Sequence, residues 1–266
     1  MPGNEKETIR FILENKNKIN LKYIGKIKTI KIPHKNKKIK VTNKNLDNFY
    51  SDDSSKKADI YLNEKGISIK QDGGSFAYNR IQRKSLLNFF SKTLSFKDTN
   101  EIINKIDNQV QIFHNKKNDD DEKSSFSPLN VMSKTQFYTL LKYLMLDGSP
   151  MEKSEFPAQY ILNSKKNISS QDDLKIFNFD EYFDKYSSVC MFRTRRCWYG
   201  QESNSEHNRA KGLLKELSNK PWCFDDVSGL PNKHKKTNKR WRDEIPQDER
   251  KTCYLLFIEE KKLSIS

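Results

Sequence analysis

The segment that most constrains the fold is 57–71, because its pattern is that of a tight β-hairpin. Apolar residues alternate with polar ones on both sides of Asn63-Glu64-Lys65-Gly66, which has Asn at the first and Gly at the last position of a type I turn. With the two middle residues as the central pair, Asp59 on the first strand faces Lys70 on the second. Ser68 and Lys70 then share one face, so the hairpin gathers a carboxylate, a hydroxyl and an ammonium group.

This arrangement resembles the PD-(D/E)xK nuclease superfamily, in which an acid on one strand and an acid-x-Lys triplet on the next hold a divalent ion and a water. The resemblance covers Asp59 and the triplet Ser68-Ile69-Lys70. Ser68 stands where the family normally has a second acid, and some restriction endonucleases of this superfamily carry Ser-x-Lys and bring the missing carboxylate from a neighbouring helix. The resemblance implies an α/β or α+β protein with a central mixed β-sheet flanked by helices, a restriction-endonuclease-like core.

The chemistry of phosphodiester hydrolysis explains these residue types. The reaction needs a cation that neutralises charge on the pentavalent phosphate, and a deprotonated water in line with the leaving oxygen. Carboxylate oxygens suit Mg²⁺, so we expect Asp59 to be the first metal ligand. Lys70 would orient the attacking water and stabilise the phosphate, and Ser68 completes the catalytic triplet. An Asp–Lys pair also occurs in many solvent-facing hairpins, where it contributes only about 0.2–1 kcal/mol.

A second metal-binding acid is expected outside the hairpin. Glu14 is the favoured candidate, because it lies near the end of a helix predicted from Glu5 to about Lys16 and the first helix of the superfamily often adds a carboxylate to the site. Glu7 and Asp53 are the alternatives.

The chain is strongly basic, with 50 Lys and Arg residues against 35 Asp and Glu residues and a net charge of +15. Such an excess favours a polyanionic partner, because each neutralised phosphate releases condensed counterions and so drives binding. A lysine-rich proteome encoded by an AT-rich genome would produce the same excess, together with many Asn and Ile residues. The composition leaves both explanations open.

Length and cysteine content set further bounds. With 266 residues, 34% of them hydrophobic, the chain can form one or two folded units. No apolar run approaches the roughly 18 residues of a membrane span, and no signal peptide is visible, which predicts a cytoplasmic protein without a membrane partner. The four cysteines contain no Cys-x-x-Cys pair, so we expect reduced thiols rather than a structural zinc site; they are Cys190, Cys197, Cys223 and Cys253.

The pattern along the chain predicts three parts. Residues 1–113 are expected to hold the catalytic core, 114–127 a polar loop or linker, and 128–266 the remainder of the sheet together with the DNA-recognition elements. Apolar spacing predicts helices over 81–93, 98–113 and 134–146, a helix over 180–186 capped by Asp180, and strands over 174–177, 188–199 and 252–258.

Candidate DNA-contacting residues lie on the strand 188–199. Arg193 and Arg195 would share one face of this strand and Arg196 the other. Arginine can read guanine in a bidentate way and also binds phosphates, so this strand is the best candidate for sequence recognition. The alternative is the basic outer face of an ordinary sheet.

Two further groups of cations are candidates for DNA contact. Arg80 and Arg83 lie at the start of a predicted helix, where cations oppose the helix dipole and an anion would explain their placement. Lys236 and Arg240 belong to the basic stretch 233–242, which could order on phosphate contact or be an exposed loop. His207 and Asn208 lack the surroundings of an HNH nuclease.

These features together predict a type II restriction endonuclease that hydrolyses double-stranded DNA at a short specific sequence with Mg²⁺. A homodimer, in which each subunit cuts one strand, would match a palindromic site. The family resemblance also implies a cognate DNA methyltransferase. Two alternatives are a non-catalytic DNA- or RNA-binding protein, and a PD-(D/E)xK enzyme with a nicking, repair or transposition role.

Overall fold

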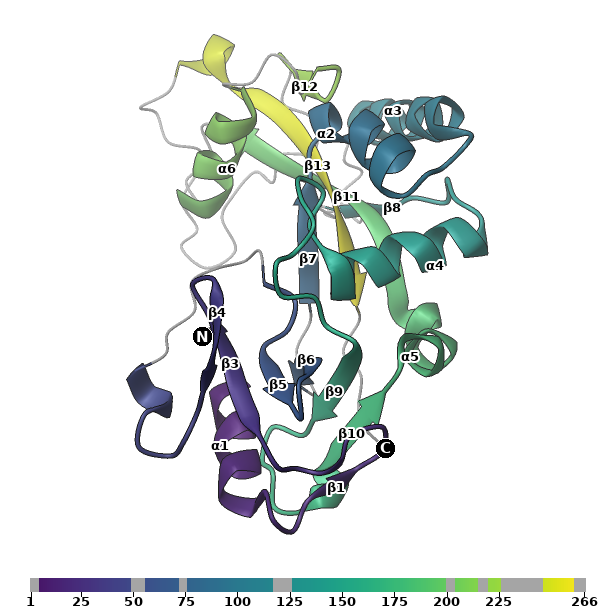
Figure 1. Cartoon of the computed structure of the whole chain (residues 1–266). Helices are drawn as coiled ribbons and strands as arrows, with labels where there is room; N and C mark the ends of the chain where they lie inside the picture. The colour runs from purple at the N-terminus through teal and green to yellow at the C-terminus, as the bar shows by residue number, and fades with distance from the viewer. Residues whose placement is uncertain are drawn as a thin grey trace. The chain divides into compact units, whose positions relative to one another are not determined.

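The computed structural model describes residues 5–48, 56–71, 76–116, 126–199, 204–214, 220–225 and 246–260. The chain forms two compact units, and it crosses between them four times (Figure 1). Unit 1 comprises Met1–Phe76, Phe137–Cys190 and Glu260–Ser266, whereas unit 2 comprises Ala77–Gln136 and Met191–Glu259. The expected catalytic core, 1–113, is therefore shared between both units.

Unit 1 is built on a six-stranded mixed sheet with the strand order β10-β9-β6-β5-β3-β4. Only β6 and β9 among these neighbours run parallel, because the chain leaves unit 1 between them. The α+β class with a central mixed sheet flanked by helices is thus confirmed. The strands are β3 (Ile30–His34), β4 (Lys37–Lys40), β5 (Ile60–Leu62), β6 (Lys65–Gln71), β9 (Tyr160–Ser164) and β10 (Leu174–Phe177), and a small separate sheet contains β1 (Asn20–Leu21) and β2 (Gly25–Lys26).

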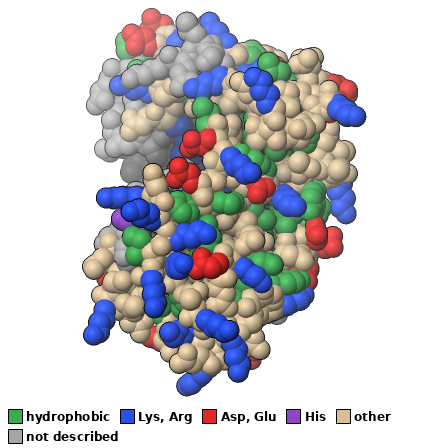
Figure 2. Space-filling model, viewed as in Figure 1, with side chains coloured by type: hydrophobic (Ala, Val, Ile, Leu, Met, Phe, Trp, Pro, Cys, Tyr) green, Lys and Arg blue, Asp and Glu red, His purple; other side chains and the backbone are tan. Residues whose placement is uncertain are grey.

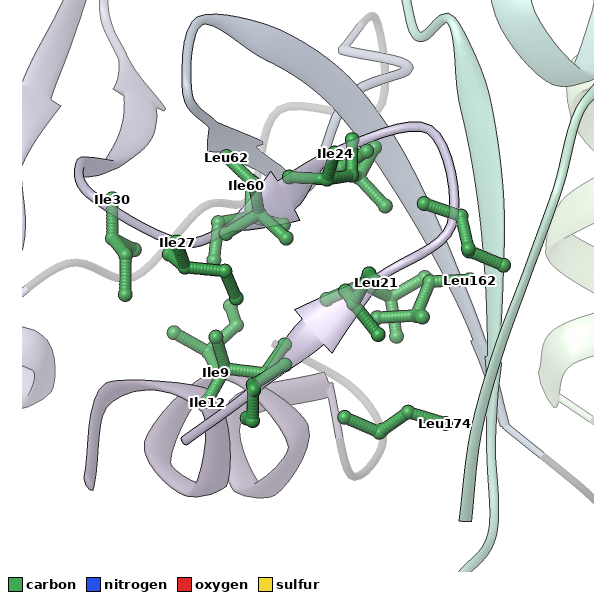
Figure 3. Close-up of a cluster of buried hydrophobic side chains, with 14 of the residues drawn as sticks. Ile9, Ile12, Leu21, Ile24, Ile27, Ile30, Ile60, Leu62, Leu162 and Leu174 are labelled. Carbon is green, nitrogen blue, oxygen red and sulfur yellow. The ribbon is translucent and has the colours of Figure 1, made fainter. Parts of the chain in front are cut away.

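The core of unit 1 lies between this sheet and α1 (Glu5–Asn15), which matches the predicted first helix. Ile9 and Ile12 are three residues apart, so they lie on one face of α1, and both are completely buried. They belong to one apolar cluster with alternate residues of the central strands, such as Ile60 and Ile67 (Figure 3 shows part of this cluster). The strands therefore bury one face against α1, and the intervening residues point to the other face.

The β5–β6 hairpin has a tighter turn than the sequence suggests. Asn63 and Glu64 have φ angles of 48° and 66° and form a two-residue turn of the I′ kind, whose twist suits a hairpin. Leu62 consequently pairs with Lys65, so the expected facing of Asp59 and Lys70 is wrong by two residues. A shift of two residues keeps every side chain on its original face, because side chains alternate with a period of two.

Two of the predicted helices differ in detail from the prediction. The predicted helix 134–146 is α4 (Lys134–Lys142), followed by a wider π-helical turn, Tyr143–Asp147. The helix α5 (Phe179–Tyr186) is capped by Asn178, whose side chain accepts a hydrogen bond from the Glu181 N–H at 2.9 Å. Asp180 was the expected cap, but it instead accepts a hydrogen bond from the Tyr138 hydroxyl.

Unit 2 has a five-stranded sheet with the strand order β12-β13-β11-β8, and β7 also pairs with β13. The predicted strand 252–258 is confirmed as a buried strand. The strands are β7 (Phe76–Ile81), β8 (Phe126–Pro128), β11 (Cys190–Tyr199), β12 (Cys223–Phe224) and β13 (Lys251–Glu260), and the helices are α2 (Arg83–Asn88), continued by the π-helical turn Phe89–Thr93, α3 (Thr99–Asn115) and α6 (Asn204–Leu214). Within the described ranges, no helix combines the length and the apolar character that crossing a bilayer requires.

Candidate functional site

The candidate site lies at the end of the unit 1 sheet where β5 begins and β6 ends. Strand β5 begins at Ile60, and Asp59 just before it donates its N–H to the Ile67 carbonyl at 2.8 Å. The Asp59 Oδ2 atom accepts a hydrogen bond from the Ile69 N–H at 2.6 Å, and the Ser68 hydroxyl also donates to this carboxylate. Asp59 and Ser68 are therefore in direct contact, with Lys70 two residues further along the same face of β6.

The Asp59 carboxyl is placed where its charge is costly. Burial raises the pKa of this carboxyl above its usual value. The nearby Lys70 ammonium group and the Ile69 N–H oppose that rise, as do Lys57 and Ser68 to a smaller degree. The site thus combines a partly buried carboxylate with cationic and hydrogen-bonding groups, an arrangement found at many functional sites and also in structural ion-pair networks.

A second carboxylate reaches the site from α1, and it is Glu5. Burial is the main cause that raises the pKa of Glu5 to about 7, repulsion by Asp59 adds to it, and Lys70 partly offsets it. Glu14 is exposed and lies nine residues later in α1, or roughly 13 Å along the helix axis at ~1.5 Å per residue. The structure thus brings the opposite end of α1 to Asp59 from the one that the sequence interpretation favoured, because the direction in which α1 crosses the sheet cannot be read from its pattern.

The other two alternatives for the second acid do not occupy this position. Glu7 is exposed, and its carboxylate accepts a hydrogen bond from Arg10 at 3.1 Å. Asp53 lies outside the described residues. Glu5 is therefore the described α1 carboxylate that interacts electrostatically with both Asp59 and Lys70.

Lys57 is a further residue of the site that the sequence interpretation did not single out. Burial and the neighbouring Lys70 charge lower the pKa of Lys57 to about 8, and Asp59 opposes this effect. The backbone N–H groups of Lys57 and Ala58 both donate to the Phe156 carbonyl, at 3.1 and 2.9 Å, which fixes the segment that leads into β5. The available signal was the spacing of two residues between Lys57 and Asp59.

Asn163 lies beside Lys70, because the two residues are partners in the parallel pairing of β6 and β9. Its side chain is only 4% exposed, and its amide oxygen has no hydrogen-bond partner among the described residues. A buried acceptor without a partner is costly, so a water or a ligand atom is expected to complete its hydrogen bonding. This residue was not recognised from the sequence, because β9 follows β6 by almost ninety positions and only the fold brings them together.

Several lysines extend over the same side of the sheet. The Lys38 ammonium group from β4 lies 3.8 Å from the ring centroid of Tyr61, which lies on β5 two residues after Asp59. The Lys56 ammonium group lies 3.4 Å from the Pro33 carbonyl oxygen of β3. Figure 2 shows that Lys and Arg side chains are spread widely over the visible face, with fewer acidic side chains among them. We refer to Lys38, Lys56, Lys57 and Lys70 as the lysine group of unit 1.

Of the arginines expected to read DNA from β11, Arg196 has a structural role. Its side chain is only 2% exposed and lies over the Phe113 ring, 3.8 Å from the centroid. It donates hydrogen bonds to the Phe113 carbonyl and to the Tyr254 hydroxyl. The expectation that Arg196 contacts DNA is therefore wrong for this structure, because its guanidinium group is enclosed by α3 and β13. Arg193 and Arg195 share the other face of β11 as expected and are partly buried.

Two of the arginines predicted to contact DNA, Arg193 and Arg83, have acidic partners within unit 2. Arg193 forms an ion pair with Glu259 on β13. Arg83 binds both carboxylate oxygens of Asp107, with distances of 2.8 Å from Nε to Oδ1 and 2.9 Å from Nη2 to Oδ2. The anion predicted near the start of α2 is thus a carboxylate of the protein itself. Of the remaining candidates, Arg80 is exposed, and Lys236 and Arg240 lie outside the described residues.

The site contains few side chains that can coordinate a metal ion. In the part of the chain that the structure describes, no group of three or more His, Cys, Asp or Glu side chains is arranged to hold a metal ion. Asp59 and Glu5 provide two carboxylates, and Ser68 provides a hydroxyl where a third acid would complete such a group. Any cation bound here would keep much of its own water, which is usual for Mg²⁺.

Comparisons with known proteins identify one weak structural similarity. No protein-family model matches the chain, and no curated protein matches it. Among solved structures, the crystal structure of restriction endonuclease MspI in complex with its cognate DNA is similar, with a TM-score of 0.28 and 11% sequence identity. The similarity covers 77% of this chain and 64% of that chain, which is less than two thirds of its length. A similarity of this size is too low to establish a shared fold.

Proposed function

We propose that the protein is a nuclease that hydrolyses phosphodiester bonds in DNA with Mg²⁺ at the site formed by Asp59, Glu5, Ser68 and Lys70. The observation that carries the proposal is the convergence of two carboxylates and a lysine at one end of a mixed sheet, with Glu5 contributed by the first helix. This is the arrangement that the Ser-x-Lys variant of the PD-(D/E)xK pattern requires, with the helix carboxylate replacing the acid missing at Ser68.

The residues present fit a hydrated divalent cation. Burial raises the pKa values of both Asp59 and Glu5, because it disfavours their charged forms, and repulsion by Asp59 raises the pKa of Glu5 further. A hard dication would reverse this penalty, and oxygen ligands are what Mg²⁺ prefers. We propose that Asp59 and Glu5 hold the ion, and that the Asn163 amide oxygen accepts a hydrogen bond from a water of its shell. Bound there, the ion would stabilise negative charge on the phosphate and lower the pKa of a water.

Side chains of the protein would orient the water, bind the phosphate and position the carboxylate. The Lys70 ammonium group would orient the attacking water and bind a non-bridging phosphate oxygen. The Ser68 hydroxyl keeps the Asp59 carboxylate in place through its hydrogen bond. Lys57 adds a second positive charge beside Lys70, so a phosphate entering the site would relieve the repulsion between the two lysines.

The substrate class follows from the charge of the chain. The lysine group of unit 1 lies on the side of the sheet that carries Asp59, and the net charge of +15 favours a polyanion. We propose double-stranded DNA as the substrate and a type II restriction endonuclease as the activity. A homodimer and a cognate DNA methyltransferase belong to the same proposal.

The decisive experiment incubates the purified full chain with plasmid DNA and Mg²⁺. We expect discrete fragments from the wild-type protein, intact but retarded DNA with Asp59→Asn, and wild-type cleavage with the control Asp172→Asn, which changes an exposed acid in the same unit. Cleavage that persists unchanged in Asp59→Asn would overturn the assignment of the site. Sequencing of the fragment ends distinguishes a restriction enzyme from a repair nuclease, because only the former cuts at a fixed sequence.

A non-catalytic nucleic-acid-binding protein is the second candidate. It is favoured by Ser68, which leaves the site with fewer carboxylates than the usual pattern of the superfamily. In that case the wild-type protein would retard the plasmid and leave it intact at every Mg²⁺ concentration, and Asp59→Asn would bind DNA at least as tightly as the wild type.

A further inference from the structure

Two cysteines of unit 2 face each other across neighbouring strands. Cys223 on β12 is the direct partner of Cys253 on β13 in their antiparallel pairing. The Tyr254 N–H donates to the Trp222 carbonyl at 2.9 Å, so a backbone hydrogen bond flanks the cysteine pair instead of joining it. Such non-hydrogen-bonded pairs have Cα atoms about 4.5 Å apart. That separation lies within the range of roughly 4.4–6.8 Å that a disulfide spans.

The side chains of this pair are also in contact. A hydrogen bond links the Cys253 and Cys223 side chains. Cys253 is completely buried in an apolar cluster with Leu255 and Phe257, whereas Cys223 is partly exposed at the edge of that cluster. Cys223 is therefore the residue of the pair that a small oxidant can reach, and the Cys253 side chain is in contact with it.

The neighbours of Cys223 hold β12 in this position. Trp222 and Phe224 flank Cys223 in the strand and so point to the opposite face. Trp222 is completely buried, and its indole N–H donates to Asp107 at 2.8 Å. The Phe224 ring stacks on His114 with the ring centroids 3.8 Å apart. Because both flanking side chains are anchored on α3, the Cys223 side chain is kept facing β13.

We propose that Cys223 and Cys253 are a modification site, at which an oxidant of low molecular weight forms a reversible cross-strand disulfide. With a peroxide, the Cys223 thiolate attacks one oxygen, the O–O bond breaks, and a sulfenic acid and water are produced after proton transfer. The Cys253 sulfur then attacks the sulfenic sulfur, the S–S bond forms, and a second water leaves with the Cys253 proton. Two thiols are oxidised and one peroxide is reduced; a reducing thiol reverses the change by exchange.

The other two cysteines are less suited to this reaction. Cys197 on β11 is completely buried and interacts electrostatically with Cys253, so it is the competing partner. Cys190 belongs to unit 1, and burial raises the pKa of its thiol to about 12. The hydrogen bond with Cys223 and burial raise the pKa of the Cys253 thiol as well, so the first attack on the oxidant is assigned to the partly exposed Cys223.

The experiment treats the folded full chain with hydrogen peroxide or oxidised glutathione, then counts thiols after denaturation and maps disulfides by mass spectrometry without reduction. We expect the thiol count to fall from four to two, with one linked peptide pair containing Cys223 and Cys253. A reducing thiol should restore all four. The Cys223→Ser variant should keep its three thiols, whereas the control Cys190→Ser should still lose two.

Three outcomes would overturn the proposal. They are a link between Cys197 and Cys253, a glutathione adduct on Cys223 without a link, and four thiols that persist under conditions that oxidise an exposed dithiol peptide. The proposal does not rest on the proposed nuclease activity, so the two can fail separately.

Discussion

Ser68 donates a hydrogen bond to the Asp59 carboxylate from the position two residues before Lys70. The serine therefore supports the charged form of the aspartate, where an acid in its place would repel that charge. The second negative charge of the site comes from Glu5 on α1 instead. This division between strand and helix can be tested by moving the charge from one element to the other.

We expect Glu5→Gln to lower the rate of DNA cleavage by about 10–100-fold, the usual cost of disturbing a metal site. Adding Ser68→Asp to the same chain should recover part of the loss, because it supplies a carboxylate from the strand. The measurement is the initial rate of plasmid cleavage as a function of Mg²⁺ concentration. Glu14→Gln is the matched control on α1 and should keep the wild-type rate; the reverse result for the two glutamates would return the role to Glu14.

The pKa of about 7 for Glu5 predicts an unusual dependence of stability on pH. The folded protein holds a proton on Glu5 at pH values where the unfolded chain, with a carboxyl pKa near its ordinary 4.5, has lost it. The free energy of unfolding should therefore fall as the pH rises from about 4.5 to about 7 in the presence of a chelator. Urea unfolding across this range should show a slope that Glu5→Gln reduces and that Mg²⁺ offsets. An equal slope in both proteins would contradict the shifted pKa.

Lys38 is expected to bind a DNA phosphate next to the site. Replacing it by Gln should weaken binding to any sequence and reduce the magnitude of the salt dependence, the slope of log K against log salt, by about 0.9. Binding titrations at several salt concentrations, with Asp59→Asn as the background to prevent cleavage, would measure both quantities. Lys105→Gln is the control, since this exposed lysine of unit 2 is paired with Glu101 at 2.6 Å. Equal slopes for the two variants would remove Lys38 from the DNA contact.

Arg196 and Arg80 should separate stability from DNA binding. Arg196→Ala removes two hydrogen bonds and a cation–π contact from the interior of unit 2, so we expect a loss of about 2–4 kcal/mol in the free energy of unfolding. Arg80→Ala changes an exposed residue and should leave stability within about 0.5 kcal/mol. If Arg80 contacts a phosphate, its variant should instead bind DNA more weakly. Chemical denaturation and gel retardation distinguish the two effects.

Asn163 offers a test in which stability and activity change in opposite directions. Its buried amide oxygen has no partner among the described residues, so Asn163→Leu is expected to leave the free energy of unfolding unchanged or to raise it. The same change should reduce the affinity for Mg²⁺, because a hydrogen-bond acceptor beside Lys70 is lost. A clear loss of stability without any effect on Mg²⁺ binding would show that Asn163 has a structural role instead.

Local patterns predicted the elements well, and contacts between distant segments limited the rest. The alternation in 57–71 placed the hairpin and the face shared by Ser68 and Lys70, although the turn and the pairing register differed. The pairing of β6 with β9 joins residues more than ninety positions apart, and the sequence of neither strand identifies the strand with which it pairs. The same limit concealed Glu5 and Asn163 as residues near the site.

The charged residues show a second limit. Arg83 and Arg196 look like nucleic-acid ligands in the sequence, because a cation at a helix start or on a strand suggests an external anion. Asp107 and the Phe113 carbonyl are the partners in the fold, and neither can be recognised before α3 is placed against β11 and α2. Composition therefore favours a polyanionic partner as a prediction, without identifying which cations are available to bind it.

The position of β9 beside β6 also decides how the protein could be divided. A fragment ending at residue 113 would contain the whole β5–β6 hairpin and yet lack the strand that covers its outer edge. The backbone N–H and C=O groups of β6 would then be open to pairing with another copy of the same fragment. We therefore expect such a fragment to aggregate, and the half that carries the candidate site to be soluble only when the chain beyond residue 160 is present.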